Sequence, residues 1–141
     1  MTNILALVLA IALQEGNGRI DQKSVGKAGE VGALQIQQIM LDDHYRTTGV
    51  RYTKTQARSW EVSVCVVTNY LAYYGKGKWT PEQCAIAWNA GPDLKPRAAE
   101  YLEGFKRHYK WVTSFPKLED AYAEAIKRSK PKVPKKRKTT L

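Results

Sequence analysis

The chain has 141 residues, of which 43% are hydrophobic and 26% charged, a balance typical of a globular domain rather than of a disordered chain. Its apolar run near the N-terminus, residues 4–13, is far shorter than the roughly 20 residues that a membrane-spanning helix needs. The formal net charge of +10 is uneven, because residues 127–141 carry eight Lys or Arg and no acid. The rest of the chain has a net charge of only +2, with no basic stripe and no nucleic-acid-binding motif, so it predicts no specific nucleic-acid partner.

The cysteines and histidines do not form a pattern typical of a metal site or of a disulfide scaffold. Cys65 and Cys84 each lie among apolar neighbours, which favours two buried thiols, although a single disulfide between adjacent helices stays open. His44 and His108 lie far apart in the chain and lack metal-ligand spacing. We therefore expect no metal and no cofactor.

The first predicted helix covers residues 3–15. It is apolar on all sides, which indicates a central, buried helix. A cleavable signal peptide is the alternative, but no Lys or Arg side chain precedes the apolar run and no clear small-x-small cleavage site precedes Glu15. We expect the mature protein to keep this segment. Residues 16–35 contain five glycines and no helical period, which predicts a loop with or without a short hairpin.

A polar, irregular stretch at residues 50–59 lies among the remaining predicted helices. These helices cover residues 36–47, 60–75, 80–89, 97–112 and about 117–128. The valines of residues 60–75 would also suit a strand. As a helix, this segment aligns four residues along one face: Val62, Val66, Tyr70 and Tyr73. Thr80 and Gln83 form a typical capping box for the helix predicted over residues 80–89. The sequence thus predicts a mainly α-helical domain over residues 1–128 and a disordered basic tail over residues 129–141.

Glu15 is the first candidate for a catalytic group. A carboxyl group at the end of a buried helix loses water, which raises its pKa, and the negative end of the helix dipole acts in the same direction. A carboxyl group that stays protonated near neutral pH can serve as a general acid. The alternative is an ordinary exposed helix-end Glu15 that pairs with Arg19 or Lys23.

Three further segments place polar side chains at positions suited to ligand binding. Gln35 follows Gly29 and Gly32 in the segment GEVGALQI, where glycines allow a close approach of the backbone to a ligand. Asn89 lies in AWNAGP, and Tyr101 lies in AAEYLEGF on the apolar face of its predicted helix. Each segment alone has a structural explanation, namely a turn before a helix, a helix cap and core packing.

In this order and at these spacings, the four segments resemble the lysozyme-like lytic transglycosylases (the SLT-type catalytic domain), in a phage or phage-like form. The resemblance covers residues 4–112. Within it, SVGKAGEVGALQI is similar to the Ala/Ser-rich loop of the family, and RYTKTQARSWEVSVCVVTNYLAYY is similar to forms found in phage proteins. Three positions depart from the family pattern, which usually has Ser at Gly16, Met at Leu34 and Tyr at Trp88.

The resemblance implies a goose-type or SLT-type helical fold with a short loop or small β-hairpin at the cleft. It implies peptidoglycan glycan strands as substrate and Glu15 as a single acid/base, which cleaves the MurNAc–GlcNAc β-1,4 bond and leaves 1,6-anhydro-MurNAc ends. Six further side chains are expected to bind the sugar, orient Glu15 or line the cleft: Gln35, Asn89, Tyr101, Ser24, Trp88 and Tyr73.

Three alternatives to the transglycosylase stay open. A hydrolytic lysozyme (muramidase) on the same fold would use Asp21 or Glu30 as a second carboxylate. A non-catalytic lysozyme-like domain would serve as a phage structural or glycan-binding module. A small nucleic-acid-binding protein would depend on the basic tail, whose charge equally suits polyanionic wall or surface polymers.

The resemblance also implies where the protein acts. We expect a monomer at the bacterial cell wall, in the periplasm or outside the cell. Because the sequence shows no clear cleavable signal peptide, a virion, a lysis pore and another secretion route all stay open as the means of delivery.

Overall fold

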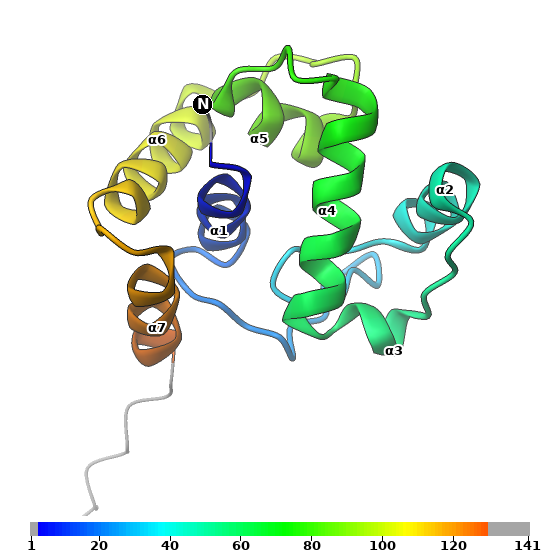
Figure 1. Ribbon diagram of the computed structural model, residues 1–141, viewed down its shortest axis with the longest axis horizontal. Coiled ribbons are helices and arrows are strands. Elements are labelled where there is room, and N and C mark those ends of the chain that lie inside the picture. Colours follow the sequence, from blue (N-terminus) through cyan, green and yellow to red (C-terminus); the bar gives the residue numbers. More distant parts are fainter. Residues whose placement is uncertain (1–2, 130–141) are drawn as a thin grey trace, which may run out of the picture.

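The computed structural model describes residues 3–129, and within this range it contains seven helices and no strand (Figure 1). The helices are α1 (Ile4–Glu15), α2 (Gln38–Thr48), α3 (Lys54–Ala57), α4 (Trp60–Gly75), α5 (Pro81–Ala90), α6 (Ala99–Thr113) and α7 (Leu118–Ser129). The predicted mainly α-helical class is therefore confirmed. No helix in the described range is both long and apolar enough to cross a bilayer.

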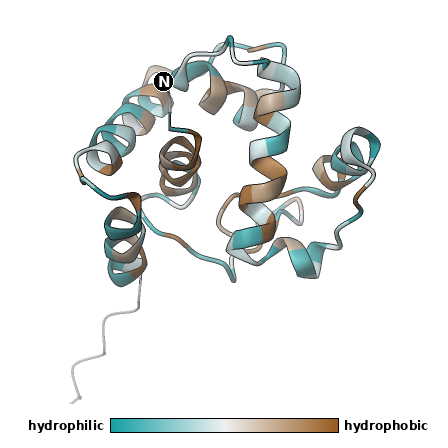
Figure 2. Ribbon diagram, viewed as in Figure 1, coloured by the Kyte–Doolittle hydropathy of each residue, from teal (hydrophilic) through white to brown (hydrophobic). Residues whose placement is uncertain are grey.

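Helix α1 forms the centre of the core. The Asn3 side chain caps it by accepting hydrogen bonds from the backbone N–H groups of Leu5 and Ala6, at 3.1 and 3.3 Å. Every residue from Ala6 to Leu13 is buried, and α1 packs against α6, α4 and α7. Figure 1 shows α1 between α6 and α4, and Figure 2 shows that it is apolar along its length.

The contact between α1 and α6 is close because α6 presents a glycine to α1. A Cβ atom at Gly104 would lie only 2.6 Å from Oε1 of Gln14, so no larger residue fits at this crossing without a shift. Phe105, the next residue along α6, is fully buried in the same core. Gly104 thus leaves room for the Gln14 side chain of the last turn of α1.

Two helices begin with a capping box, of which one was predicted. Thr80 accepts a hydrogen bond from the backbone of Gln83, whose side chain accepts in return from the Thr80 N–H, which confirms the capping box of α5. Thr53 and Gln56 form the same reciprocal pair at α3. The prediction of an irregular stretch over residues 50–59 was therefore wrong in part, because this box starts one turn of helix there.

Helix α4 is helical, as predicted, and of its predicted apolar line Val66 is buried while Val62 and Tyr70 pack against the core. Its buried positions are Ser63, Val66, Val67, Leu71 and Gly75. Tyr73, predicted on the inner face, is 48% exposed. Ser63 is tolerated in the core because its hydroxyl donates to the Ala57 carbonyl oxygen at 2.7 Å, so no polar atom of the side chain is left unpaired.

The C-terminal end and the cysteines differ in part from what the sequence predicted. Helix α7 includes Ser129, so the last described residue is helical where the sequence predicted the start of the tail. The predicted disorder of residues 130–141 lies outside the described residues. Both cysteines are free thiols, with Cys84 buried and Cys65 half-buried.

Candidate active site

The loop between α1 and α2 begins with a tight turn directly after Glu15. The N–H of Gly16 donates to the Ala12 carbonyl oxygen at 2.9 Å, and the N–H of Gly18 donates to that of Leu13 at 2.7 Å. A Cβ atom at Gly16 would lie 1.9 Å from the carbonyl oxygen of Arg19. A serine, which the family pattern has at this position, does not fit this turn, so Gly16 is explained by the local backbone.

The rest of the loop folds back on itself through isolated bridges rather than through a hairpin of regular strands. Val31 bridges both Val25 and Ile36, with backbone hydrogen bonds of 3.0 and 2.9 Å between Val31 and Ile36. The side chains of Val31, Leu34 and Ile36 are buried and anchor the loop to the core. The loop is therefore a packed structure whose polar side chains have fixed positions.

Gln35 is held in this loop by its side-chain amide group. Its backbone has a positive φ of 52°, and its Nε2 donates to the Ser24 hydroxyl at 3.0 Å and to the Gly32 carbonyl at 2.8 Å. Both amide hydrogens are thus used within the loop. The oxygen of Gln35 remains as an acceptor for a ligand, and Ser24 serves to position Gln35.

Glu15 lies half-buried at the end of α1, beside side chains from two other helices. Asn89 of α5 donates from Nδ2 to Glu15 Oε1 at 3.3 Å. Burial raises the pKa of Glu15 above its ordinary value of 4.5, and the nearby charge of Glu30 adds to this effect. Hydrogen bonds from Asn89 and Tyr101 and the charge of Arg97 act in the opposite direction but do not cancel the effect of burial.

The predicted alternative role of Glu15, an ion pair with Arg19 or Lys23, is not what the structure shows. No ion pair within residues 3–129 includes Glu15. A carboxyl group that has lost water without gaining an ionic partner holds its proton more tightly. This is the electrostatic state that a general acid needs.

Tyr101 stands next to Glu15 on α6. Its hydroxyl donates to the Ala85 carbonyl oxygen at 3.1 Å and lies close enough to the Glu15 carboxyl group to influence the pKa of that group. Burial, followed by the charge of Glu15, raises the pKa of Tyr101 above its ordinary value, so the hydroxyl keeps its hydrogen. With a single hydrogen, the hydroxyl donates to one of the two acceptors at a time. Tyr101 can therefore respond to the charge on Glu15.

Asn89 is positioned by its neighbour Trp88. The indole Nε1 of Trp88 donates to the Leu34 carbonyl oxygen at 3.0 Å, which ties α5 to the loop that carries Gln35. The Trp88 ring also packs edge-on against Tyr70, with ring centroids 5.3 Å apart, and only 4% of its surface is exposed. Trp88 is thus mainly a structural residue with one edge at the site.

These side chains meet in a polar pocket of about 240 Å³. Its lining residues come from α1, the loop, α2 and α5: Glu15, Glu30, Gln35, Gln37, Met40, Trp88 and Asn89. Of the predicted site residues, the pocket brings together Glu15, Gln35, Asn89 and Trp88. The other three predicted binding residues, Tyr101, Ser24 and Tyr73, are not part of the lining, although Tyr101 lies close enough to Glu15 to influence its pKa.

The two candidates for a second carboxylate have different positions. Glu30 lines the pocket, and its Oε1 accepts a hydrogen bond from the backbone N–H of Ala28 at 3.0 Å. A Cβ atom at Gly26 would overlap Oε2 of Glu30, so the glycine makes room for this carboxylate. Asp21 is exposed, accepts from the N–H of Lys23 at 3.0 Å and does not line the pocket.

Three residues of the site were missed in the sequence. Gln37 and Met40 lie at the start of α2 and line the pocket, and Arg97 lies close enough to Glu15 and Tyr101 to influence the pKa of both. Nothing local marks these residues as functional, because they reach the pocket only through tertiary packing, that of α2 against α4 and that of α6, which follows Arg97, against α1. Within residues 3–129 no cluster of His, Cys, Asp and Glu suits a metal ion.

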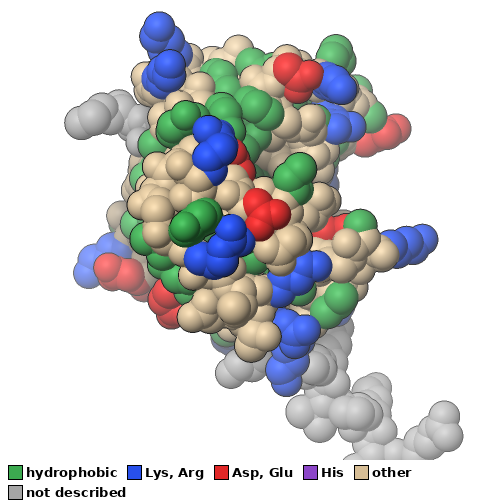
Figure 3. All heavy atoms as spheres, turned by 90° about the vertical axis from the view of Figure 1, so that its right-hand side faces the viewer, with side chains coloured by type: hydrophobic (Ala, Val, Ile, Leu, Met, Phe, Trp, Pro, Cys, Tyr) green, Lys and Arg blue, Asp and Glu red, His purple; other side chains and the backbone are tan. Residues whose placement is uncertain are grey.

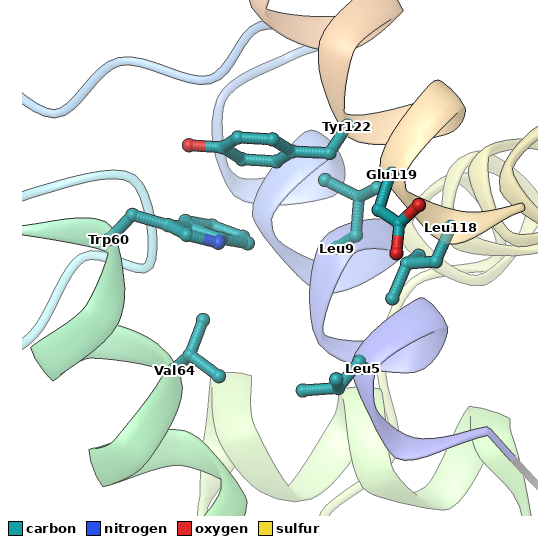
Figure 4. Close-up of a pocket in the computed structure, with 7 residues that line it drawn as sticks. All are labelled: Leu5, Leu9, Trp60, Val64, Leu118, Glu119 and Tyr122. Atoms are coloured by element: carbon teal, nitrogen blue, oxygen red, sulfur yellow. The ribbon is translucent and has the colours of Figure 1, made fainter.

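A second cavity, of about 250 Å³, lies between α1, α4 and α7 (Figure 4). It is lined by Leu5, Leu9, Trp60, Val64, Leu118, Glu119 and Tyr122. The rings of Trp60 and Tyr122 lie 5.1 Å apart, centroid to centroid. Glu119 is the one carboxylic acid of this lining, and no amide side chain of the lining donates to it as Asn89 does to Glu15.

The outer surface of α2 and α3 does not form a basic patch. Figure 3 views the molecule from this side and shows Lys and Arg side chains interspersed with Asp and Glu. Two salt bridges involve residues of α2: Asp43 pairs with Arg46 of the same helix at 2.6 Å, and Asp42 pairs with Arg51, which follows the helix, at 2.8 Å. This face offers no continuous positive surface of the kind that tracks a phosphate backbone.

The polar pocket around Glu15 is therefore the candidate active site, because it combines a desolvated acid with converging amide groups. Its identification depends on geometry and chemistry. Comparisons of the chain with protein-family models, with curated proteins and with solved structures give no match.

Proposed function

We propose that this protein is a peptidoglycan lytic transglycosylase with a lysozyme-like fold, which acts at the bacterial cell wall with Glu15 as its acid/base. The observation that carries the proposal is the environment of Glu15. The carboxyl group lies at the end of a buried helix, has a raised pKa, accepts from Asn89 and opens into a polar pocket together with Gln35. The resemblance in the sequence implies a catalytic Glu at the end of the first core helix, and burial there explains its raised pKa.

The proposed first step is protonation of the glycosidic oxygen by Glu15. The bond from this oxygen to C1 of the muramoyl sugar breaks, and the sugar N-acetyl group assists by stabilising the positive charge at C1. Glu15 then accepts the proton of the C6 hydroxyl, whose oxygen bonds to C1 and closes a 1,6-anhydro ring. No water is consumed, and Glu15 ends the cycle protonated, as it began.

The neighbouring residues support both states of Glu15. In the protonated state, burial favours the neutral carboxyl group. After proton transfer, Asn89 and Tyr101 can donate to the carboxylate, and the charge of Arg97 favours it. Because Ser24 and Gly32 engage both amide hydrogens of Gln35, its proposed role narrows to accepting a hydrogen bond through its oxygen, such as one from the N–H of an N-acetyl group.

A hydrolytic lysozyme is the second candidate, and the position of Glu30 favours it. Glu30 lines the same pocket as Glu15 and could activate a water on the far side of the sugar. Its carboxylate is, however, engaged by the loop backbone at Ala28. The two reactions differ in their products, because a transglycosylase leaves 1,6-anhydro ends and a hydrolase leaves reducing ends.

The test is digestion of purified peptidoglycan by wild type, Glu15→Gln and Glu30→Gln, followed by mass analysis of the released fragments. We expect anhydro-muropeptides from wild type, essentially none from E15Q, and the same anhydro products from E30Q. Reducing ends that are lost in E30Q would favour the hydrolase. No release by wild type would leave a non-catalytic glycan-binding or phage structural module, for which sedimentation with peptidoglycan is the readout.

A further inference from the structure

A third cavity lies on the far side of the turn that follows Glu15. It has a volume of about 210 Å³ and is enclosed by the end of α1, the turn at Gly18, α6 and α7. Its lining residues are Leu13, Gly18, Arg107, His108, Trp111, Ala125 and Arg128. None of them lines the pocket around Glu15, so the two cavities are separate sites.

The walls of this cavity are fixed to one another. The backbone N–H of Ile20 and the Ser129 hydroxyl are hydrogen-bonded at 2.6 Å, which joins the loop to the end of α7. The guanidinium group of Arg128 lies over the ring of Trp111, 4.5 Å from its centroid, which joins α7 to α6. The cavity is therefore part of the fold rather than a gap between independent segments.

The rim of the cavity carries positive charge, whereas its floor is apolar. Arg128 has one weak acidic partner, Glu124 at 3.7 Å, and Arg107 has none among residues 3–129. Burial, together with the charge of Arg107, lowers the pKa of His108, so its ring is mainly neutral at pH 7. The floor beneath these groups consists of Leu13, Trp111 and Ala125.

This combination selects for a particular ligand chemistry. Guanidinium groups prefer carboxylates and phosphates, which they can bind in a bidentate manner. An apolar cavity of about 150 Å³ is enough to accept benzene, so 210 Å³ leaves room for a ring-sized body. We infer that the cavity binds a small anion with an apolar body, an aryl or short-chain carboxylate or phosphate monoester, with the anionic group at Arg107 and Arg128 and the body against Leu13 and Trp111.

The direct test is an NMR titration of the full chain with phenyl phosphate and with benzoate, and it does not depend on the proposed function. We expect saturable shifts of the Trp111 indole and His108 ring signals, and a rise in the pKa of His108 because a bound anion opposes the charge of Arg107. Inorganic phosphate, which lacks a body, and benzyl alcohol, which lacks a charge, should each bind at least about tenfold more weakly. Binding of only one of the two anionic probes would assign the site to that head group.

Arg107→Gln and Lys110→Gln form a matched pair of variants, since both side chains are exposed on α6 but only Arg107 lines the cavity. R107Q should weaken phenyl phosphate about tenfold, as expected for a lost charge-assisted hydrogen bond, whereas K110Q should change it less than about twofold. Thermal unfolding checks that both variants are folded. Equal weakening by both, inorganic phosphate binding as tightly as phenyl phosphate, or shifts centred on Trp60 or Trp88 would overturn the inference.

Discussion

Two of the cavities that border α1 are of nearly equal size and opposite chemistry. Beside Leu5 and Leu9 the cavity is about 250 Å³ and apolar, whereas the pocket at Glu15 is about 240 Å³ and polar. Size therefore does not decide which of them is an active site. The difference arises because α1 ends on a single acid directly before a loop whose glycines and amides surround it, and because the burial of α1 removes water from that acid.

The largest expected effect comes from making the same substitution in both cavities. Glu15→Gln removes the proposed acid/base and should lower peptidoglycan cleavage by about 10²- to 10⁴-fold, the usual contribution of general acid–base catalysis. Glu119→Gln removes the acid of the apolar cavity and should change the rate less than about twofold. The measurement is the initial rate of fragment release at equal concentrations of folded protein. Equal losses in both variants would contradict the assignment of the site.

The second prediction concerns the free energy of unfolding, for which the apolar cavity should matter more than the pocket at Glu15. Leu9 borders the apolar cavity and is 1% exposed, so Leu9→Ala should lower the free energy of unfolding by about 2–5 kcal/mol. E15Q should lower it little or not at all, because it removes a poorly solvated carboxyl group. Urea denaturation of both variants measures the difference. If L9A were neutral, the apolar side of α1 would not be the part that holds the domain together.

The sequence predicted well what is determined locally. The apolar run predicted α1, and the Thr80–Gln83 pair predicted the start of α5. The short helix α3 was missed because four residues give no periodic pattern. Tyr73 was assigned to the inner face, whereas packing of α4 against α1 and α3 turns a neighbouring line of residues, including Ser63, toward the core.

The candidate site was only partly predictable, because its contacts join distant parts of the chain. Asn89 reaches Glu15 across 74 positions, and Trp88 reaches Leu34 across 54. No local pattern fixes such contacts, so these residues were grouped through a family resemblance. Arg97 and Met40 were not predicted, because neither residue lies in a segment that carries the family resemblance.

The third prediction tests the turn that separates Glu15 from the loop. Gly16→Ser introduces the residue that the family pattern has, but its Cβ would lie 1.9 Å from the Arg19 carbonyl oxygen. We expect a loss of about 1–3 kcal/mol in the free energy of unfolding, typical of overpacking, and a lower cleavage rate because Glu15 is displaced. Gly49→Ser separates steric overlap from backbone strain, since its Cβ would meet no atom within 4 Å but its φ of 78° is left-handed, a conformation that side chains rarely adopt. An active, stable G16S protein would show that the turn can relax.

The smallest expected effect is the dependence of stability on pH. Burial raises the pKa of Glu15 above 4.5, so the folded state binds this proton more tightly than the unfolded state does. The resulting stabilisation is fully present below pH 4.5 and is lost as the pH rises through the raised pKa. The free energy of unfolding of wild type should therefore fall relative to that of E15Q as the pH rises over that interval. Above the interval, the difference between the two proteins should stay constant. The effect is small because Glu15 is only half-buried.

The E119Q variant is the control, because it keeps Glu15 and its stability should depend on pH as that of wild type does. The cleavage rate of wild type should fall over the same pH interval because the proton donor is lost.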